Sequence, residues 1–260
     1  MSEIRHKSMD NTRRLSAIGG MKRLVRKLAG LAGLRPVVAA LREFWNRGTV
    51  RHAARAARGR IAHYLASTAS PRLQIGASSH LLEGWLNSDI NLHVPELVYL
   101  DCLRPFPVGD EAFDYVYCEH FIEHLDQAGG LACMREVSRC LKRGGVFRVA
   151  TPDLEKFLGL FAAQRTAEQD RYLVRFAGLL DLDRVTPGEV LNLVMREWGH
   201  RHIYSRADLK AALLASGFSQ VVDVEVGESA HEALRGIERH QAYAGEESNR
   251  FETMVVEATK

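Results

Sequence analysis

An alternation of short apolar strands with helices, running from residue 72 to the end of the chain, constrains the fold most strongly. Strands that alternate with crossover helices lie parallel in one sheet. The alternation therefore predicts a Rossmann-like, doubly wound α/β fold with a mostly parallel seven-stranded sheet and an antiparallel C-terminal hairpin. A helix is expected over 131–141, before the fifth strand, and another after a cap at Ser205. The strands are expected at residues 72–75, 85–90, 98–101, 113–118, 146–150, 220–226 and 253–258.

Charge divides the chain into two parts. Residues 1–66 hold 15 Lys or Arg against three acids, a net charge of +12, whereas residues 67–260 carry −9. Apolar residues recur at helical spacing in the first part, so we expect a basic helical arm over 1–66 and the sheet domain over 67–260. Within that domain, residues 154–204 are expected to be an insertion that covers a substrate.

The basic arm has three interpretations. Its helices can pack on the acidic body, lie on anionic lipid as a peripheral membrane contact, or dock nucleic acid. Nucleic acid is the least favoured, because aromatic residues are scarce and no recognisable binding module accompanies the arginines. The sequence carries no signal for an oligomeric state.

Four cysteines form no CxxC pair, which is typical of neither a zinc finger nor a disulfide framework. No apolar run reaches the roughly 18–20 residues of a membrane-spanning helix. We therefore expect a cytoplasmic location, with the inner membrane surface as the alternative if the arm contacts lipid. We expect no metal centre.

Polar residues gather where the expected strands end, which is where an open parallel sheet binds its ligand. Gly76 can start a tight turn that lets the backbone approach a ligand. Asp89 can accept bonds from two ribose hydroxyls, and Asp101 lies where an adenine edge would be. Each residue also has a plainer interpretation: an ordinary turn, a helix cap and a loop acid facing water.

Four segments at these strand ends resemble a known family. LQIG, GWLNSDI, LDCLRPFPVGDEAFDYVYCEHFIEHL and LKRGGVFRVATPDL are similar to the successive motifs of class I S-adenosylmethionine-dependent methyltransferases. The likeness spans residues 72–260, with 101–125 as its most specific part. It is closest to predicted methyltransferases encoded near polysaccharide biosynthesis genes, to which GHRHIYS and MVVEATK are also similar.

The resemblance implies methyl transfer from S-adenosyl-L-methionine to an oxygen or nitrogen of an acceptor. That acceptor would be a small molecule, sugar or glycan, lipid-linked in one version. Cofactor contacts are implied for Gly76, Asp89 and Asp101. The whole expected set at the strand ends is Ile75, Gly76, Ala77, Ser78, Asp89, Asp101, Cys102, Leu103 and Cys118.

Two histidine-containing segments are expected near the reacting methyl group. Glu119, His120 and His124 follow the fourth strand and are the catalytic candidates. A hydroxyl acceptor needs a base, and a histidine has a pKa near neutrality. Glu119 would orient a histidine or bond the amino group of the cofactor. Helix packing and a solvated loop are the plainer interpretations of these segments. The expected substrate contacts are His200, His202 and Tyr204, and His200 and His202 are also the reserve candidates for the base.

Three alternative functions stay open. The family usually has a second glycine at the third position of the first turn, where this chain has Ser78, so a non-catalytic scaffold protein is one alternative. A second is a zinc hydrolase, since residues 120–124 match the HxxEH pattern; it would need His120 and His124 on one helix face and a third ligand. A third is a nucleic-acid methyltransferase, although no Asn-Pro-Pro-Tyr-like tetrapeptide follows the fourth strand.

Overall fold

The computed structural model describes residues 52–260, and a compact unit beginning at Ala56 holds the whole sheet. Helical residues 56–67 belong to this unit, because Ala57 and Ile61 are buried and the Arg60 guanidinium donates to two carbonyl oxygens of the loop before the third strand, each at 2.7 Å. Most of the expected arm, residues 1–51, lies outside the described residues. Its boundary at residue 66 and its contacts with lipid or nucleic acid stay predictions.

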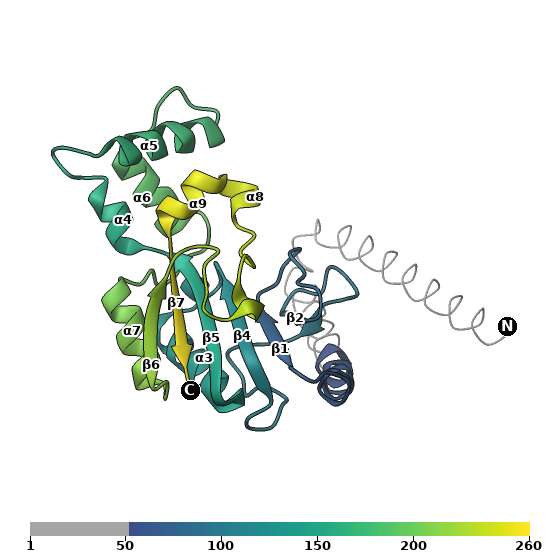
Figure 1. Ribbon diagram of the computed structural model, residues 1–260. Coiled ribbons are helices and arrows are strands. Elements are labelled where there is room, and N and C mark those ends of the chain that lie inside the picture. Colours follow the sequence, from purple (N-terminus) through teal and green to yellow (C-terminus); the bar gives the residue numbers. More distant parts are fainter. Residues whose placement is uncertain (1–51) are drawn as a thin grey trace, which may run out of the picture. The chain divides into compact units, whose positions relative to one another are not determined.

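The sheet has seven strands in the order β3-β2-β1-β4-β5-β7-β6 (Figure 1). Strands β1 to β5 pair in parallel, whereas β7 is antiparallel to both β5 and β6. The chain reverses its direction of travel across the sheet between β1 and β4, which creates a topological switch point there. This arrangement confirms the predicted fold class. The strands are β1 (Arg72–Ile75), β2 (Leu86–Asp89), β3 (Val98–Tyr99), β4 (Phe113–Glu119), β5 (Leu141–Pro152), β6 (Gln220–Val224) and β7 (Thr253–Thr259).

Several helices lie beyond the carboxyl ends of the parallel strands. In Figure 1, α4, α5, α6, α8 and α9 stand past the ends of β4 and β5, while α3 and α7 flank the sheet. No helix within residues 52–260 has the length and apolar character needed to cross a membrane. The helices are α3 (Gln127–Cys140), α4 (Leu154–Gly159), α5 (Ala167–Leu179), α6 (Pro187–Arg196), α7 (Arg206–Ala215), α8 (Gln241–Ala244) and α9 (Glu246–Glu252), with 3₁₀ turns η2 (Ile122–His124) and η3 (Glu232–Leu234).

Local sequence sets the starts of the helices that follow β5. Thr166 and Thr186 each form a capping box, which satisfies backbone N–H groups that the first helical turn leaves free. The Ser205 hydroxyl accepts from the backbone N–H of Asp208 and caps α7, as expected. The segment 154–204 therefore forms helices with defined ends.

Two elements differ from the sequence expectation. Helix α3 begins at Gln127, four residues early, with Asp126 as its cap. Gly130 lies in the first turns of this helix. A Cβ at this position would lie only 2.5 Å from the Tyr204 hydroxyl oxygen, so the absence of a side chain allows α3 to pack closely against Tyr204. Strand β5 extends beyond the expected 146–150 at both ends, since antiparallel β7 pairs with it as far as Pro152.

The helices beyond the sheet have an apolar core of their own. Phe157, Tyr172, Phe176 and Val190 are buried together, and Phe251 of α9 joins them. Burial of this kind stabilises a segment by about 25 cal/mol per Å² of apolar surface. The segment 154–204 is thus packed against α9 beyond the carboxyl ends of the strands.

Candidate active site

The turn after β1 takes an unusual backbone conformation. Gly76 has a φ of +68°, and a Cβ there would lie 2.5 Å from the Phe121 ring, so only glycine fits. Ser78 has a φ of +44°, in the left-handed region that a glycine would adopt more readily. The backbone N–H of Ser78 donates to Asp89 at 3.1 Å. The turn therefore forms with serine in the third position and is tied to the end of β2.

The Asp89 carboxylate keeps unused hydrogen-bond acceptor capacity. One carboxylate oxygen accepts from Ser78 N and the other from Asn91 N, at 3.1 and 2.7 Å. A carboxylate oxygen has two lone pairs, so each can still accept a bond from a ribose hydroxyl. Asp89 is half-buried, and its contact with the ribose of a bound cofactor stays a prediction.

The remaining expected cofactor contacts fall into two groups. Asp101 bonds within its own loop, accepting from Leu103 N and Arg104 Nε, while the Leu103 side chain is exposed. The other group is buried and apolar. A hydrogen bond to Cys133 together with burial raises the pKa of Cys102, and burial raises the pKa of Cys118, so both thiols stay neutral. The buried group consists of Ile75, Ala77, Cys102 and Cys118.

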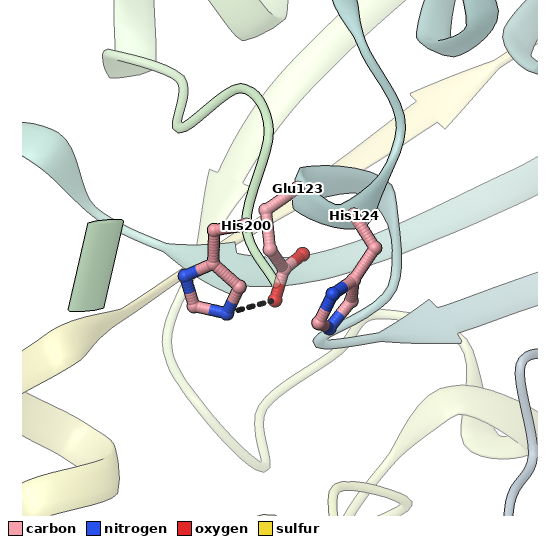
Figure 2. A group of neighbouring side chains, drawn as sticks. All are labelled: Glu123, His124 and His200. Carbon is pink, nitrogen blue, oxygen red and sulfur yellow. Dashed lines mark ion pairs between the residues drawn. The ribbon is translucent and has the colours of Figure 1, made fainter. Parts of the chain in front are cut away.

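A fully buried carboxylate, Glu123 in η2, lies among several imidazoles just beyond β4. The Thr151 hydroxyl donates to Glu123 Oε2 at 2.9 Å. Glu123 Oε1 lies 3.4 Å from His120 Nδ1 and 4.0 Å from His200 Nε2, and among the described residues it has no hydrogen-bond partner. Figure 2 shows Glu123 between His200 and the exposed His124. We call Glu123, His124 and His200 the histidine–glutamate cluster.

His120 lies at the edge of this cluster in a strained conformation. Its φ is +44°, its Nε2 is 3.1 Å from Thr253 Oγ1, and its ring stacks on that of His240 at 3.6 Å between centroids. Burial lowers the pKa of His120, but contact with Glu123 and the charges of neighbouring acids more than offset this and raise it. Strained non-glycine residues concentrate at functional sites.

Glu119 holds a distant segment in place. Its carboxylate accepts from the backbone N–H groups of Arg239 and His240, at 2.8 to 2.9 Å. The His240 imidazole also contacts Glu252 Oε1 at 2.9 Å. Glu119 thus positions the residues that stack on His120. Whether it also contacts a bound cofactor stays a prediction.

The second expected group of residues is divided by the fold. The His200 side chain is buried and belongs to the histidine–glutamate cluster, and burial lowers its pKa. The backbone N–H groups of Arg201 and His202 donate to the Glu123 carbonyl oxygen at 2.7 and 3.1 Å. Tyr204 is in the core against Gly130, where burial raises its pKa to about 12. The structure therefore brings His200 to the cluster and holds Tyr204 away from solvent.

Sequence reasoning missed the residues that complete this site. Glu123 appeared only as part of the HxxEH pattern, and no local signal marked Thr151, Thr253 or His240. These residues come from β5, β7 and the loop before α8, which only the sheet order brings together. The HxxEH set itself does not assemble as an α-helix, because η2 has only three residues and His120 is directed to Thr253.

Part of the chain matches a known family. Residues 48–149 match a family model described as "Methyltransferase domain". No curated protein matches the chain. Among solved structures, a SAM dependent methyltransferase from Archaeoglobus fulgidus is 16% identical with a TM-score of 0.43, over 84% of this chain and 99% of that chain.

Two further solved structures are similar at the same level. An S-adenosylmethionine dependent methyltransferase from Mesorhizobium loti is 15% identical with a TM-score of 0.41, over 74% of this chain and 92% of that chain. A Thermotoga maritima protein described as a possible histamine N-methyltransferase is 16% identical with a TM-score of 0.43, over 85% and 96%. We take no substrate from these likenesses. Residues 48–149 of this chain are therefore similar to a methyltransferase domain, and they include strands β1 to β4 of the sheet.

Proposed function

We propose that this chain is an S-adenosylmethionine-dependent methyltransferase, and that it transfers the methyl group to a hydroxyl of a sugar or glycan. The observation that carries the proposal is the histidine–glutamate cluster beyond β4, with His120 beside it. S-adenosyl-L-methionine supplies a methyl group on a sulfonium, which is a good leaving group for in-line displacement. The turn at Gly76–Ser78 and the Asp89 carboxylate would hold its methionine and ribose ends.

The acceptor type follows from what the cluster can do. A hydroxyl must lose its proton as it is methylated, whereas a neutral amine can attack without prior help from a base. A positioned histidine contributes typically 10²–10⁴-fold by accepting such a proton. His124 is exposed and His120 is half-buried beside Glu123, so these two imidazoles are the candidates for that proton.

An exposed aromatic ring supports a carbohydrate acceptor. Trp198 is 42% exposed, and its ring lies 6.0 Å from His200 and 5.7 Å from Phe176. A flat apolar face of this kind can pack against the C–H face of a sugar ring. The resemblance of residues 199–205 and 254–260 to polysaccharide-associated methyltransferases supports the same acceptor class. A basic arm on anionic lipid would suit a lipid-linked glycan.

The test is methyl transfer from labelled S-adenosylmethionine to a panel of monosaccharides, nucleotide sugars and lipid-linked glycans. We expect label in a product that resists mild alkali, since a methyl ether survives conditions that hydrolyse a methyl ester. His124→Gln should lower the rate by about 10²–10⁴-fold while calorimetric binding of S-adenosylhomocysteine is unchanged. His93→Ala, at an exposed histidine outside the cluster, is the control.

Three outcomes would overturn the proposal: an alkali-labile product, label on an amine, or label on RNA or DNA. An unchanged rate in His124→Gln and in His120→Gln would remove the assigned role of the histidines. Asp89→Ala should abolish cofactor binding, which separates a failed cofactor site from a wrong acceptor.

A further inference from the structure

We propose that Glu123, His124 and His200 bind a divalent transition-metal ion of the zinc class. One ligand atom from each residue lies within 4.8 Å of the other two. Figure 2 shows the carboxylate between the two rings, with His200 Nε2 directed at it. The metal site that this geometry points to differs from the HxxEH set, since His200 takes the place of His120.

The donor set suits such an ion. Two imidazoles and one carboxylate form a three-ligand site that leaves a further position open, an arrangement found in catalytic zinc centres. Nitrogen and oxygen ligands about 2.0–2.1 Å from the metal lie about 3.3 Å apart in tetrahedral geometry. The spacing here is wider, so binding requires a small contraction. The exposed side chain of His124 can move to supply it.

A buried oxygen without a partner is the second observation. Glu123 is fully buried, and its Oε1 makes no hydrogen bond within the described part of the chain, although His120 Nδ1 lies 3.4 Å from it as an ion-pair partner. Buried polar atoms are nearly always satisfied, so each exception calls for an explanation. Thr151 holds the other oxygen at 2.9 Å, which orients Oε1 toward the cluster in the way that outer-shell groups orient metal ligands.

The backbone arranges the ligands in advance. Glu123 and His124 share η2, and His200 lies in the segment whose N–H groups donate to the Glu123 carbonyl oxygen. His124 Nδ1 lies 3.3 Å from the carbonyl oxygen of Gly199, the residue before His200. Both ligand-bearing segments are therefore joined to each other by hydrogen bonds that do not involve the proposed ion.

The location gives the ion a role that rests on the proposed function. A divalent cation at the carboxyl end of β4 would bind the acceptor hydroxyl and lower its pKa, so that the oxygen is a better nucleophile at neutral pH. His120 stays outside the ligand set, because it contacts Thr253 and stacks on His240. With the ion bound, His124 would be a ligand and His120 would be the imidazole left to accept the hydroxyl proton. This proposal revises our expectation from sequence that the chain has no metal centre.

The experiment uses the purified full chain, stripped with a chelator and without S-adenosylmethionine or acceptor. Co²⁺ titration is followed by visible absorption, and Zn²⁺ titration by calorimetry. We expect one equivalent of each, with the intense bands of four- or five-coordinate Co²⁺. His124→Ala and His200→Ala should each weaken binding at least about tenfold, because even outer-shell changes cost that much. His93→Ala should leave binding unchanged.

Folding is checked in the same samples by thermal unfolding of each metal-free variant. His124→Ala removes an exposed side chain, so its fold should persist even if His200→Ala unfolds. Weak binding of several equivalents, or affinity unchanged in His124→Ala, would overturn the site. The readout is metal binding alone, so the metal site and the sugar acceptor are tested independently. The protein can bind the ion without methylating sugars, and it can methylate sugars without binding the ion.

Discussion

Two buried acidic centres in this domain differ in how their charges are satisfied. Arg148 in β5 is fully buried, and its guanidinium donates to Glu238 Oε1 and Glu257 Oε1, each at 2.6 Å. It also donates to the Glu228 carbonyl oxygen at 2.8 Å. Glu123 is equally buried, yet one of its oxygens has no hydrogen-bond partner among the described residues.

The difference separates a structural centre from a functional one. In the Arg148 centre the guanidinium pairs with the carboxylates of Glu238 and Glu257 and ties the loop after β6 to β5 and β7. Such a centre is closed, because its guanidinium is already used. The histidine–glutamate cluster lies beyond the carboxyl end of β4 and keeps an acceptor atom free. A buried charge left incomplete at a ligand-binding edge is a mark of function.

Breaking the closed centre should give the largest stability effect. Arg148→Met leaves Glu238 and Glu257 buried without their cation, and loss of one partner from a buried pair costs about 3–5 kcal/mol. Urea unfolding followed by circular dichroism measures this loss. Arg143→Met, at a side chain that is 91% exposed and contacts Glu111, is the matched control and should change stability by about 0–1 kcal/mol. Equal losses in the two variants would contradict a structural role for the Arg148 centre.

Glu123→Gln should separate stability from function. The amide keeps the size of the carboxylate and can still accept from Thr151, so the expected loss of stability is about 1 kcal/mol, the size of one hydrogen bond. Methyl transfer and Co²⁺ binding should fall far more, because the negative charge is removed. The same unfolding experiment beside a rate measurement checks this. If Glu123→Gln destabilised the protein as strongly as Arg148→Met, the contrast between the two centres would fail.

The smallest effect is expected at a partly exposed pair. Hydrogen bonds from Arg139 and Phe106 N lower the pKa of Glu136 below its ordinary value. A carboxylate with a lowered pKa stabilises the fold above its unfolded pKa of about 4.3, and that contribution is lost as pH falls through the lower folded value. The free energy of unfolding of Glu136→Gln should therefore be lower than that of the original chain by at most about 1 kcal/mol at pH 6.

The difference in free energy of unfolding between Glu136→Gln and the original chain should then narrow toward pH 3, because Glu136 of the original chain becomes protonated there. Melting temperatures across this range provide the measurement. A difference that grew on acidification would show that the Glu136 carboxylate is held in its neutral form in the fold, against the direction stated here.

Local signals determined much of the fold in advance. Apolar runs located the strands, and Gly76 predicted a tight turn after the first of them, whereas the contact with the Phe121 ring appeared only in the structure. Ser205 predicted the start of α7, because a hydroxyl before an apolar-periodic segment caps a helix. Arg148 and Glu257 carry opposite charges and fall in two of the expected strands. Only the register of β5 and β7 shows that they lie opposite each other.

The sequence by itself determined the strands, the helix cap at Ser205 and the placing of Gly76, Asp89 and His120 at strand ends, because those features depend on neighbours along the chain. Only the tertiary structure decided which distant groups meet. It brought His200 to Glu123 through backbone bonds to a carbonyl oxygen, and placed Thr151 and Thr253 beside the same histidines through the β5–β7 pairing. Contacts of this kind depend on sheet order and packing, which no local pattern of residues encodes.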